Sequence, residues 1–268
     1  MTYYQELWRR CRNLGKTETI GRTVLGYEIP LIRGGSETLV VCSTHAREHC
    51  ATEALFRTFE KNGLRCDFLP VHNVDGVLLA KFGADAVDVS RRKRLIEING
   101  GEDFSLWKAN ANAVDLNVNF DARWSQGVRN VFFSAPENYV GPYPESEPET
   151  KAVASLLRRE KYAQVVSFHA KGEVVYWGFA PNFLHYREAK AFADAMGYGI
   201  ATAIGSCGGL KDYFDLLGNG LGLTVELGED KFSHPYPDGE IPRLVEKLNQ
   251  SMEILYENGK ELKRKIYG

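Results

Sequence analysis

The chain has 268 residues, of which 44% are hydrophobic and 25% are charged, a composition typical of a globular protein with a large core. Its formal net charge is only -2, and its one basic run, at 91–94, is short and is expected to lie in an exposed loop. Nucleic-acid and anionic-membrane binding are therefore disfavoured, and no apolar stretch near the amino terminus predicts a signal peptide or a membrane span.

The predicted elements alternate between strands and helices along the chain. Short runs rich in β-branched or aromatic residues predict strands at 38–43, 65–71, 164–169, 173–178 and 222–227. Helical periodicity predicts helices near 3–13, 48–62, 147–161, 185–196, 211–217 and 238–263. We therefore expect one α/β domain over residues 1–268, with a mixed, mostly parallel twisted sheet and helices on both of its faces.

Two local features qualify this pattern. The segment 82–133 is rich in Asn, Gly and charge and has little periodicity, so it is predicted to be irregular and functional. The helix at 147–161 has a start signal, because Ser146 can cap it, Pro148 fits its first turn and Glu149 can complete a capping box.

The first chemical motif lies where the strand at 38–43 gives way to the helix at 48–62. His45 and Glu48 are three positions apart there, a spacing that places two side chains on the same face of a helical turn. Histidine nitrogen and carboxylate oxygen are both zinc ligands. A four-residue pattern of this kind is common by chance, so it indicates a metal site only if the chain supplies further ligands.

Two later residues supply what a hydrolytic zinc site still needs. His169 ends the apolar strand at 164–169, and Glu226 lies inside the apolar run 221–228, where a carboxylate is costly unless it serves a purpose. Zinc lowers the pKa of water to near neutrality, so a nearby carboxylate can act as a general base. Taken singly, His169 is more typical of a hydrogen-bonded core or strand-end histidine, and Glu226 is equally consistent with a salt-bridged residue.

Eight ordered sequence blocks carry a family resemblance. They are HARE at 45–48, NVDG at 73–76, WKAN at 107–110, VDLN at 114–117, SEPET at 146–150, SFH at 167–169, GGLKDY at 208–213 and TVE at 224–226. On these blocks the chain resembles the zinc carboxypeptidase family, and within it the bacterial γ-D-glutamyl-diaminopimelate peptidases, including the murein peptide amidases.

The resemblance implies a role for each matched site residue. It implies one zinc ion per chain, held by His45, Glu48 and His169. Glu226 is then the general base that later returns a proton to the leaving amine, and Asp115 is the carboxylate that orients a ligating histidine. Two further histidines, His49 and His72, match no metal position and are predicted not to bind the ion.

Substrate contacts are also implied. Arg47 and Asn117 fall at substrate-binding positions of the family. Lys108 aligns with the arginine that polarises the scissile carbonyl and would stabilise the developing oxyanion, with Arg94 as the competing candidate.

The departures from the family pattern bear on the substrate. Val118 stands where digestive carboxypeptidases carry the arginine that grips a C-terminal carboxylate, so ordinary C-terminal trimming is disfavoured. Lys211 aligns with the base of the specificity pocket, where an ammonium would favour an anionic group. Ile204 replaces a mobile tyrosine, and Tyr198 and Tyr236 are the candidates to substitute for it.

These features predict a zinc metallopeptidase that hydrolyses the γ-D-glutamyl–meso-diaminopimelate amide of murein peptides. The alternatives are a metallocarboxypeptidase that releases acidic C-terminal residues and a zinc-dependent binder that captures murein peptides without cleaving them. The five cysteines are odd in number and include no C-x-x-C pair, so we expect reduced thiols and a cytoplasmic protein. The sequence does not predict an oligomeric state.

Overall fold

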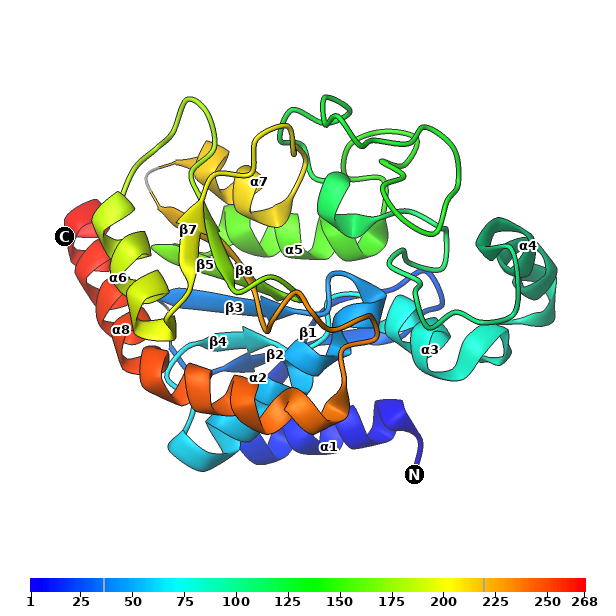
Figure 1. The fold of residues 1–268 in the computed structure, drawn as a ribbon, viewed down its shortest axis with the longest axis horizontal. Coiled ribbons are helices and arrows are strands. Elements are labelled where there is room, and N and C mark those ends of the chain that lie inside the picture. The colour runs from blue at the N-terminus through cyan, green and yellow to red at the C-terminus, as the bar shows by residue number, and fades with distance from the viewer. Residues whose placement is uncertain (36, 219) are drawn as a thin grey trace.

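A single mixed sheet organises the computed structural model, which describes residues 1–35, 37–218 and 220–268 (Figure 1). Within these residues the strand order is β1-β2-β4-β3-β5-β8-β6-β7. The strands are β1 (Lys16–Arg22), β2 (Glu28–Arg33), β3 (Thr38–Cys42), β4 (Asp67–Leu69), β5 (Gln164–His169), β6 (Val174–Trp177), β7 (Gly199–Ala201) and β8 (Leu221–Glu226). The four central strands β4, β3, β5 and β8 are mutually parallel. Antiparallel pairings join β1 to β2, β2 to β4 and β6 to β8.

Helices cover both faces of this sheet. They are α1 (Tyr3–Leu14), α2 (His49–Asn62), α3 (Val74–Phe82), α4 (Val89–Asn99), α5 (Pro148–Arg159), α6 (Tyr186–Met196), α7 (Leu210–Leu217) and α8 (Ile241–Tyr267). Figure 1 shows α1, α2 and α8 below the sheet and α5 and α7 above it. The predicted fold class, a mixed α/β sheet flanked by helices on both faces, is therefore confirmed. Within the described residues, no helix is both long enough and apolar enough to cross a membrane.

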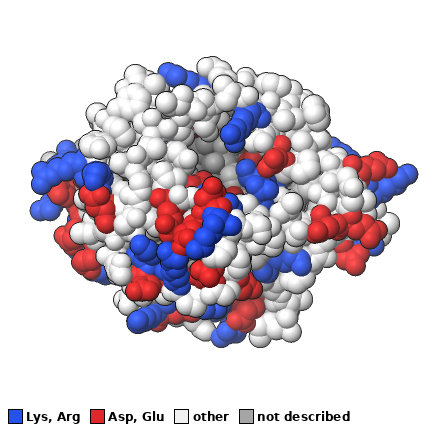
Figure 2. Space-filling model, in the orientation of Figure 1, with Lys and Arg blue, Asp and Glu red and all other residues white. Residues whose placement is uncertain are grey.

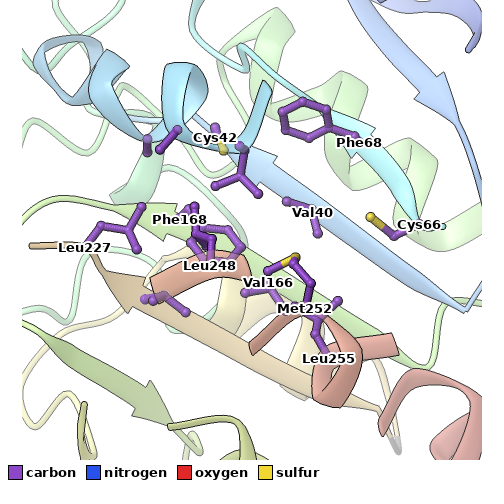
Figure 3. Packing of buried hydrophobic residues seen from close by; sticks show 14 of the residues in the cluster. Val40, Cys42, Cys66, Phe68, Val166, Phe168, Leu227, Leu248, Met252 and Leu255 are labelled. Carbon is purple, nitrogen blue, oxygen red and sulfur yellow. The ribbon is translucent and has the colours of Figure 1, made fainter. Parts of the chain in front are cut away.

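The side chains of the central strands alternate between two hydrophobic cores. On β3, Val40 and Cys42 belong to the core between the sheet and helices α2 and α8. Leu39 and Val41 belong to the core between the sheet and helices α5 and α7. Figure 3 shows Val40 in the first core with residues of α8, among them Leu248. Because both faces are buried, these strands are continuous apolar runs in the sequence, which is why they were predictable.

The structure adds elements that the sequence pattern did not predict. The strands β1, β2 and β7 and the helices α3 and α4 were all missed. The expected exposed loop at 91–94 is wrong, because these residues lie within α4. The predicted capping box is also wrong: α5 has Glu147 at its N-cap position, and the hydroxyl of Ser146 donates instead to the Glu147 carboxylate, at 2.7 Å.

Candidate active site

The site forms where three parallel strands end side by side. His169 is the last residue of β5 and lies opposite Glu226, the last residue of β8. His45 follows the end of the neighbouring strand β3 by three residues. The carboxyl ends of parallel strands are where open α/β sheets place their ligands, because the chain leaves the sheet there in loops. The sheet thus brings together residues that are far apart in the sequence.

His45, Glu48 and His169 form a buried cluster whose ligand atoms all lie within 4.8 Å of one another. A short 3-10 turn, Ala46–Glu48, follows His45 and carries Glu48 to it. The Nδ1 atom of His45 lies 2.9 Å from Glu48 Oε1, and the Nδ1 atom of His169 lies 2.9 Å from Glu48 Oε2. The two Nδ1 atoms are 3.1 Å apart. The predicted ligands therefore converge on one small volume.

The partners of the two Nε2 atoms indicate whether the cluster is suited to bind a metal ion. His45 Nε2 lies 3.3 Å from Asp115 Oδ1, and His169 Nε2 lies 2.9 Å from the hydroxyl of Ser167. A proton on each Nε2 leaves both Nδ1 lone pairs directed inward, beside the carboxylate of Glu48. Two such nitrogens and one carboxylate are the His2Glu donor set of catalytic zinc sites, so the residues fit zinc.

The charge around His45 favours a cation. Burial lowers the pKa of His45, but the carboxylates of Glu48 and Asp115 outweigh it and raise the pKa to about 9. Burial also opposes the ionised form of Glu48, yet the two histidines hold its pKa well below the usual range. The cluster thus stabilises positive charge at its centre.

Asp115 supports the cluster from outside. Its Oδ1 atom faces His45 Nε2 and accepts the backbone N–H of Asn117 at 3.0 Å, while its Oδ2 atom accepts the backbone N–H of Asn138 at 3.0 Å. Burial opposes its charge, but His45, the charge of Lys108 and the N–H of Asn138 hold its pKa far below the usual value. Asp115 is therefore a fixed carboxylate that can orient His45, the position that the sequence predicted for it.

Glu226 differs from Glu48 and Asp115 in that its carboxylate has no hydrogen bond or ion pair with any described residue. Its side chain lines the cavity in front of the cluster. Burial first, and the Glu48 carboxylate second, raise the pKa of Glu226 well above the usual value. An unpaired carboxylate with a raised proton affinity is suited to accept a proton from a water molecule in the cavity.

The cavity measures about 610 Å³ and contains most of the predicted substrate residues. His45, Lys108, Asn117, Lys211 and Glu226 all line it. Figure 2 shows this face of the molecule hollowed above its middle, with both basic and acidic side chains at the margin. A cleft of this size, whose wall carries many polar and charged side chains, suits a polar small-molecule or peptide ligand.

The two candidates for polarising a carbonyl are separated by position. Lys108 lines the cavity, and its charge acts on His45, His169 and Glu226. Arg94 lies on α4, donates to the hydroxyl of Ser134 at 2.9 Å and is not among the described residues that line the cavity. The geometry therefore favours Lys108.

Arg47 occupies a position beside Lys108. Its Nη1 atom donates to the carbonyl of Leu106 at 3.1 Å, and its Nη2 atom lies 3.7 Å from the Glu137 carboxylate, which also lies 3.8 Å from Lys108 Nζ. Arg47 itself is not among the described residues on the cavity wall. A direct contact between Arg47 and the substrate stays a prediction.

Lys211 lies on the cavity wall, but its ammonium already has partners. Its Nζ atom lies 2.7 Å from Asp212 Oδ1 and 3.4 Å from Asp215 Oδ2, and it donates to the carbonyl of Gly178 at 2.9 Å. An ammonium has three N–H donors, and three acceptors surround this one. The predicted role of Lys211 in binding an anionic substrate group is therefore a proposal that its present bonding does not favour.

The tyrosine positions differ from the expectation. The hydroxyls of Tyr198 and Tyr236 accept the backbone N–H groups of Gly228 and Glu229, each at 3.2 Å, and neither ring is among the described residues on the cavity wall. Tyr176 of β6 does line the cavity, and sequence reasoning missed it. It lies opposite Thr224 of β8, a pairing that strand prediction alone does not reveal.

His49 and His72, which the sequence predicts not to bind the ion, lie outside the metal-type cluster. Lys81 Nζ lies 3.3 Å from His49 Nδ1, and His72 Nε2 lies 3.1 Å from the backbone carbonyl of Glu149. The metal-type cluster formed by the described residues contains neither histidine. Burial lowers the pKa of each to about 4, so both are neutral at physiological pH.

A sheet whose parallel strands end in this His2Glu cluster is an α/β architecture with a candidate zinc site. A model of the family described as zinc carboxypeptidase matches residues 62–213, more than half of the chain. The chain therefore belongs to the zinc carboxypeptidase family, a family of zinc-dependent peptidases, as the sequence resemblance predicted.

The chain is also similar to an individual curated protein over most of its own length. The chain is 31% identical over 255 residues to gamma-D-glutamyl-L-diamino acid endopeptidase 1 of Lysinibacillus sphaericus, with 85% of this chain and 63% of the relative covered. It thus spans less than two thirds of that relative's length.

Solved structures share the fold. Murein-tripeptide amidase from Escherichia coli O157 is 25% identical with a TM-score of 0.61, covering 90% of this chain and 91% of its own. Bovine thrombin-activatable fibrinolysis inhibitor has a TM-score of 0.75 at 20% identity, covering 98% of this chain and 95% of its own, which establishes a common fold alone.

Proposed function

We propose that this protein is a zinc-dependent peptidase that hydrolyses the amide bond between γ-D-glutamate and meso-diaminopimelate in murein peptides. The observation that carries the proposed hydrolysis is the unpaired carboxylate of Glu226, opposite His169 at the edge of the His45–Glu48–His169 cluster. The choice of bond is supported by relatives named for γ-D-glutamyl-diamino acid and murein-tripeptide cleavage.

The chain's own residues divide the work of such a reaction. One zinc ion bound by His45, Glu48 and His169 would supply Lewis acidity and lower the pKa of water. Glu226 takes the proton of the attacking water and returns it to the leaving amine.

Two further residues support the same step. Lys108 faces the cavity as an ammonium that can offset negative charge developing on the carbonyl oxygen. Asp115 holds the ring of His45 in the orientation that directs its Nδ1 atom inward.

Val118 bears on the type of substrate. It lines the cavity and has an apolar side chain, so it cannot hold the carboxylate of a peptide's free C-terminus. This favours an amidase of murein peptides over a carboxypeptidase that trims ordinary C-termini. A cytoplasmic role in murein recycling is part of the same proposal, supported by five cysteines that are all free thiols.

Cleavage of two defined peptides tests the proposal. The zinc-loaded protein is incubated with L-Ala-γ-D-Glu-meso-diaminopimelate and, separately, with a standard peptide ending in Glu, and the products are identified by mass spectrometry. We expect diaminopimelate to be released from the first peptide. Release of Glu from the second peptide alone would favour the carboxypeptidase, and binding without any cleavage would favour a non-catalytic murein-peptide binder.

A further inference from the structure

The cavity wall carries three lysine or arginine side chains among the described residues: Lys108, Arg129 and Lys211. These cations are the strongest partners that the wall offers to a substrate rich in carboxylates, because burying a carboxylate without a partner is costly and a charged donor forms the stronger hydrogen bond. The three side chains differ in how much of their charge is already used. That difference identifies the one most able to bind a ligand.

The ammonium groups of Lys211 and Lys108 both have carboxylate neighbours that offset their charge. The ammonium of Lys211 is buried between the carboxylates of Asp212 and Asp215, so the local charge at this part of the wall is not positive. Lys108 lies beside the catalytic groups and 3.8 Å from Glu137. Its position suits the scissile carbonyl rather than a more distant carboxylate.

Arg129 differs from these two lysines because its charge has no partner among the described residues. It is exposed, and no described residue forms a hydrogen bond or ion pair with its guanidinium. Its backbone is nevertheless held in place: the N–H of Val128 donates to the carbonyl of Gly205 at 2.9 Å, and the N–H of Asn130 donates to the carbonyl of Gly127 at 3.1 Å. A free guanidinium on a fixed loop can form paired hydrogen bonds with a carboxylate at little further ordering cost.

We propose that Arg129 binds a carboxylate of the amino acid released on the amine side of the cleaved amide, and so determines the preference for a diamino dicarboxylic acid. The inference rests on the proposed function, and it assigns to Arg129 the anion binding that Val118 cannot provide. Diaminopimelate has two carboxylates, one next to the scissile amide and one at the distal carbon. Lysine in the same place has only the first.

Steady-state kinetics of Arg129→Gln on three substrates tests this inference. The substrates are γ-D-Glu-meso-diaminopimelate, the same peptide with its distal carboxylate converted to an amide, and the same peptide with its proximal carboxylate converted to an amide. On the first we expect KM to rise about 10-fold or more with kcat nearly unchanged, because a charge-assisted contact is lost. On one of the amides the variant and the wild type should differ by less than about 2-fold, and that amide identifies the carboxylate bound.

Control variants separate recognition from folding and from general charge. Arg187→Gln removes another exposed arginine, on α6 and outside the described cavity wall, and should leave KM unchanged on all three substrates. Arg129→Lys should recover part of the lost affinity, because it keeps the charge without the paired geometry. An unchanged KM in Arg129→Gln, or an equal rise on all three substrates, overturns the inference.

A direct binding measurement tests the role of Arg129 independently of the proposed peptidase activity. If the wild type cleaves none of the peptides, the proposed function fails, and calorimetric titration with free meso-diaminopimelate then decides the role of Arg129. Binding that is at least about 10-fold weaker in Arg129→Gln supports it. Equal affinity of the two proteins, or no binding to either, overturns it.

Discussion

Two groups of carboxylates in this protein differ in what their oxygen atoms contact. The first, which we call the catalytic group, consists of the proposed zinc ligands His45, Glu48 and His169 and the proposed base Glu226. The second, which we call the structural cluster, consists of Asp75, Glu147 and Glu149. Both draw on the sequence blocks that carry the family resemblance, and both contain buried ionisable side chains, so burial alone does not distinguish them.

In the structural cluster every carboxylate oxygen accepts a hydrogen bond. Asp75 accepts from the hydroxyl of Thr23 and the N–H of Leu25, and Glu149 accepts from the N–H of Val24 and the amide of Asn110. The oxygens of Glu147 accept from the Ser146 hydroxyl and the side-chain amides of Asn110 and Asn112. No acceptor is left without a partner, so this cluster joins loops together and is not a binding site.

In the catalytic group, by contrast, not every carboxylate oxygen accepts a hydrogen bond from a separate donor. Glu226 has no partner among the described residues, and the inner atoms of the ligand cluster face one another rather than separate donors. The comparison teaches that unused hydrogen-bonding capacity, more than burial, marks the functional carboxylate. The same amide substitution in the two groups should therefore have different consequences.

The largest expected effect follows from Glu226→Gln. The amide cannot accept a proton from water, so we expect kcat to fall by about 10²- to 10⁴-fold. Zinc content by elemental analysis and the melting temperature should stay close to wild type, because the carboxylate holds no partner in the fold. A kcat within a few-fold of wild type would remove Glu226 from the role of base.

Asp115→Asn should have the next largest effect, on metal affinity. An amide side chain cannot supply the negative charge that orients His45, so zinc affinity should weaken by about 10- to 100-fold. Competition with a chelator measures this loss, with His45→Ala as the reference for a removed ligand. Unchanged zinc retention in both variants would show that the ion is not bound by this cluster.

The smallest expected effect belongs to the structural cluster, and it concerns pH. Burial, followed by the nearby Asp75 carboxylate, raises the pKa of Glu149 from 4.5 to about 8. A folded-state pKa above the unfolded one gives stability that is complete below about pH 4.5 and is lost as the pH rises through about 8. The melting temperature of the wild type relative to Glu149→Gln should therefore fall across this range, by about 2–4 °C per kcal/mol lost.

Measurements on Glu149→Gln also test whether the structural cluster acts separately from the catalytic group. Zinc content and kcat of Glu149→Gln should match the wild type at a temperature where both are folded. A melting-temperature difference that stays constant across the range, or a large loss of kcat, would mean that the structural cluster is not what its hydrogen bonds indicate.

The positions of the candidate ligands and the candidate base could be predicted because they lie at or near the ends of strands in the centre of the sheet. Such strands, β5 and β8 among them, are continuous apolar runs, so His169 and Glu226 stand out against their neighbours. Glu48 followed from its spacing to His45. These positions depend on local pattern and on the rule that parallel strands end together.

The other side of the cavity could not be predicted, because it depends on contacts between distant loops. Arg129 reaches the wall through the hydrogen bond between Val128 and Gly205, and Tyr176 reaches it through the pairing of β6 with β8. The strand β1 was missed because it is largely polar and half-exposed. The partners of Lys211 were missed because one of them, the Gly178 carbonyl, comes from another element.

The hydrogen bond between Val128 and Gly205 has a practical consequence for engineering. It joins two loops that line the cavity, and none of the candidate zinc ligands lies in either loop. Libraries that randomise positions 128–130 can therefore search for new peptide specificities while the hydrolytic machinery is left intact. Position 205 should be kept as glycine, because its backbone has φ +78° and an added Cβ would lie 3.1 Å from the Val128 side chain.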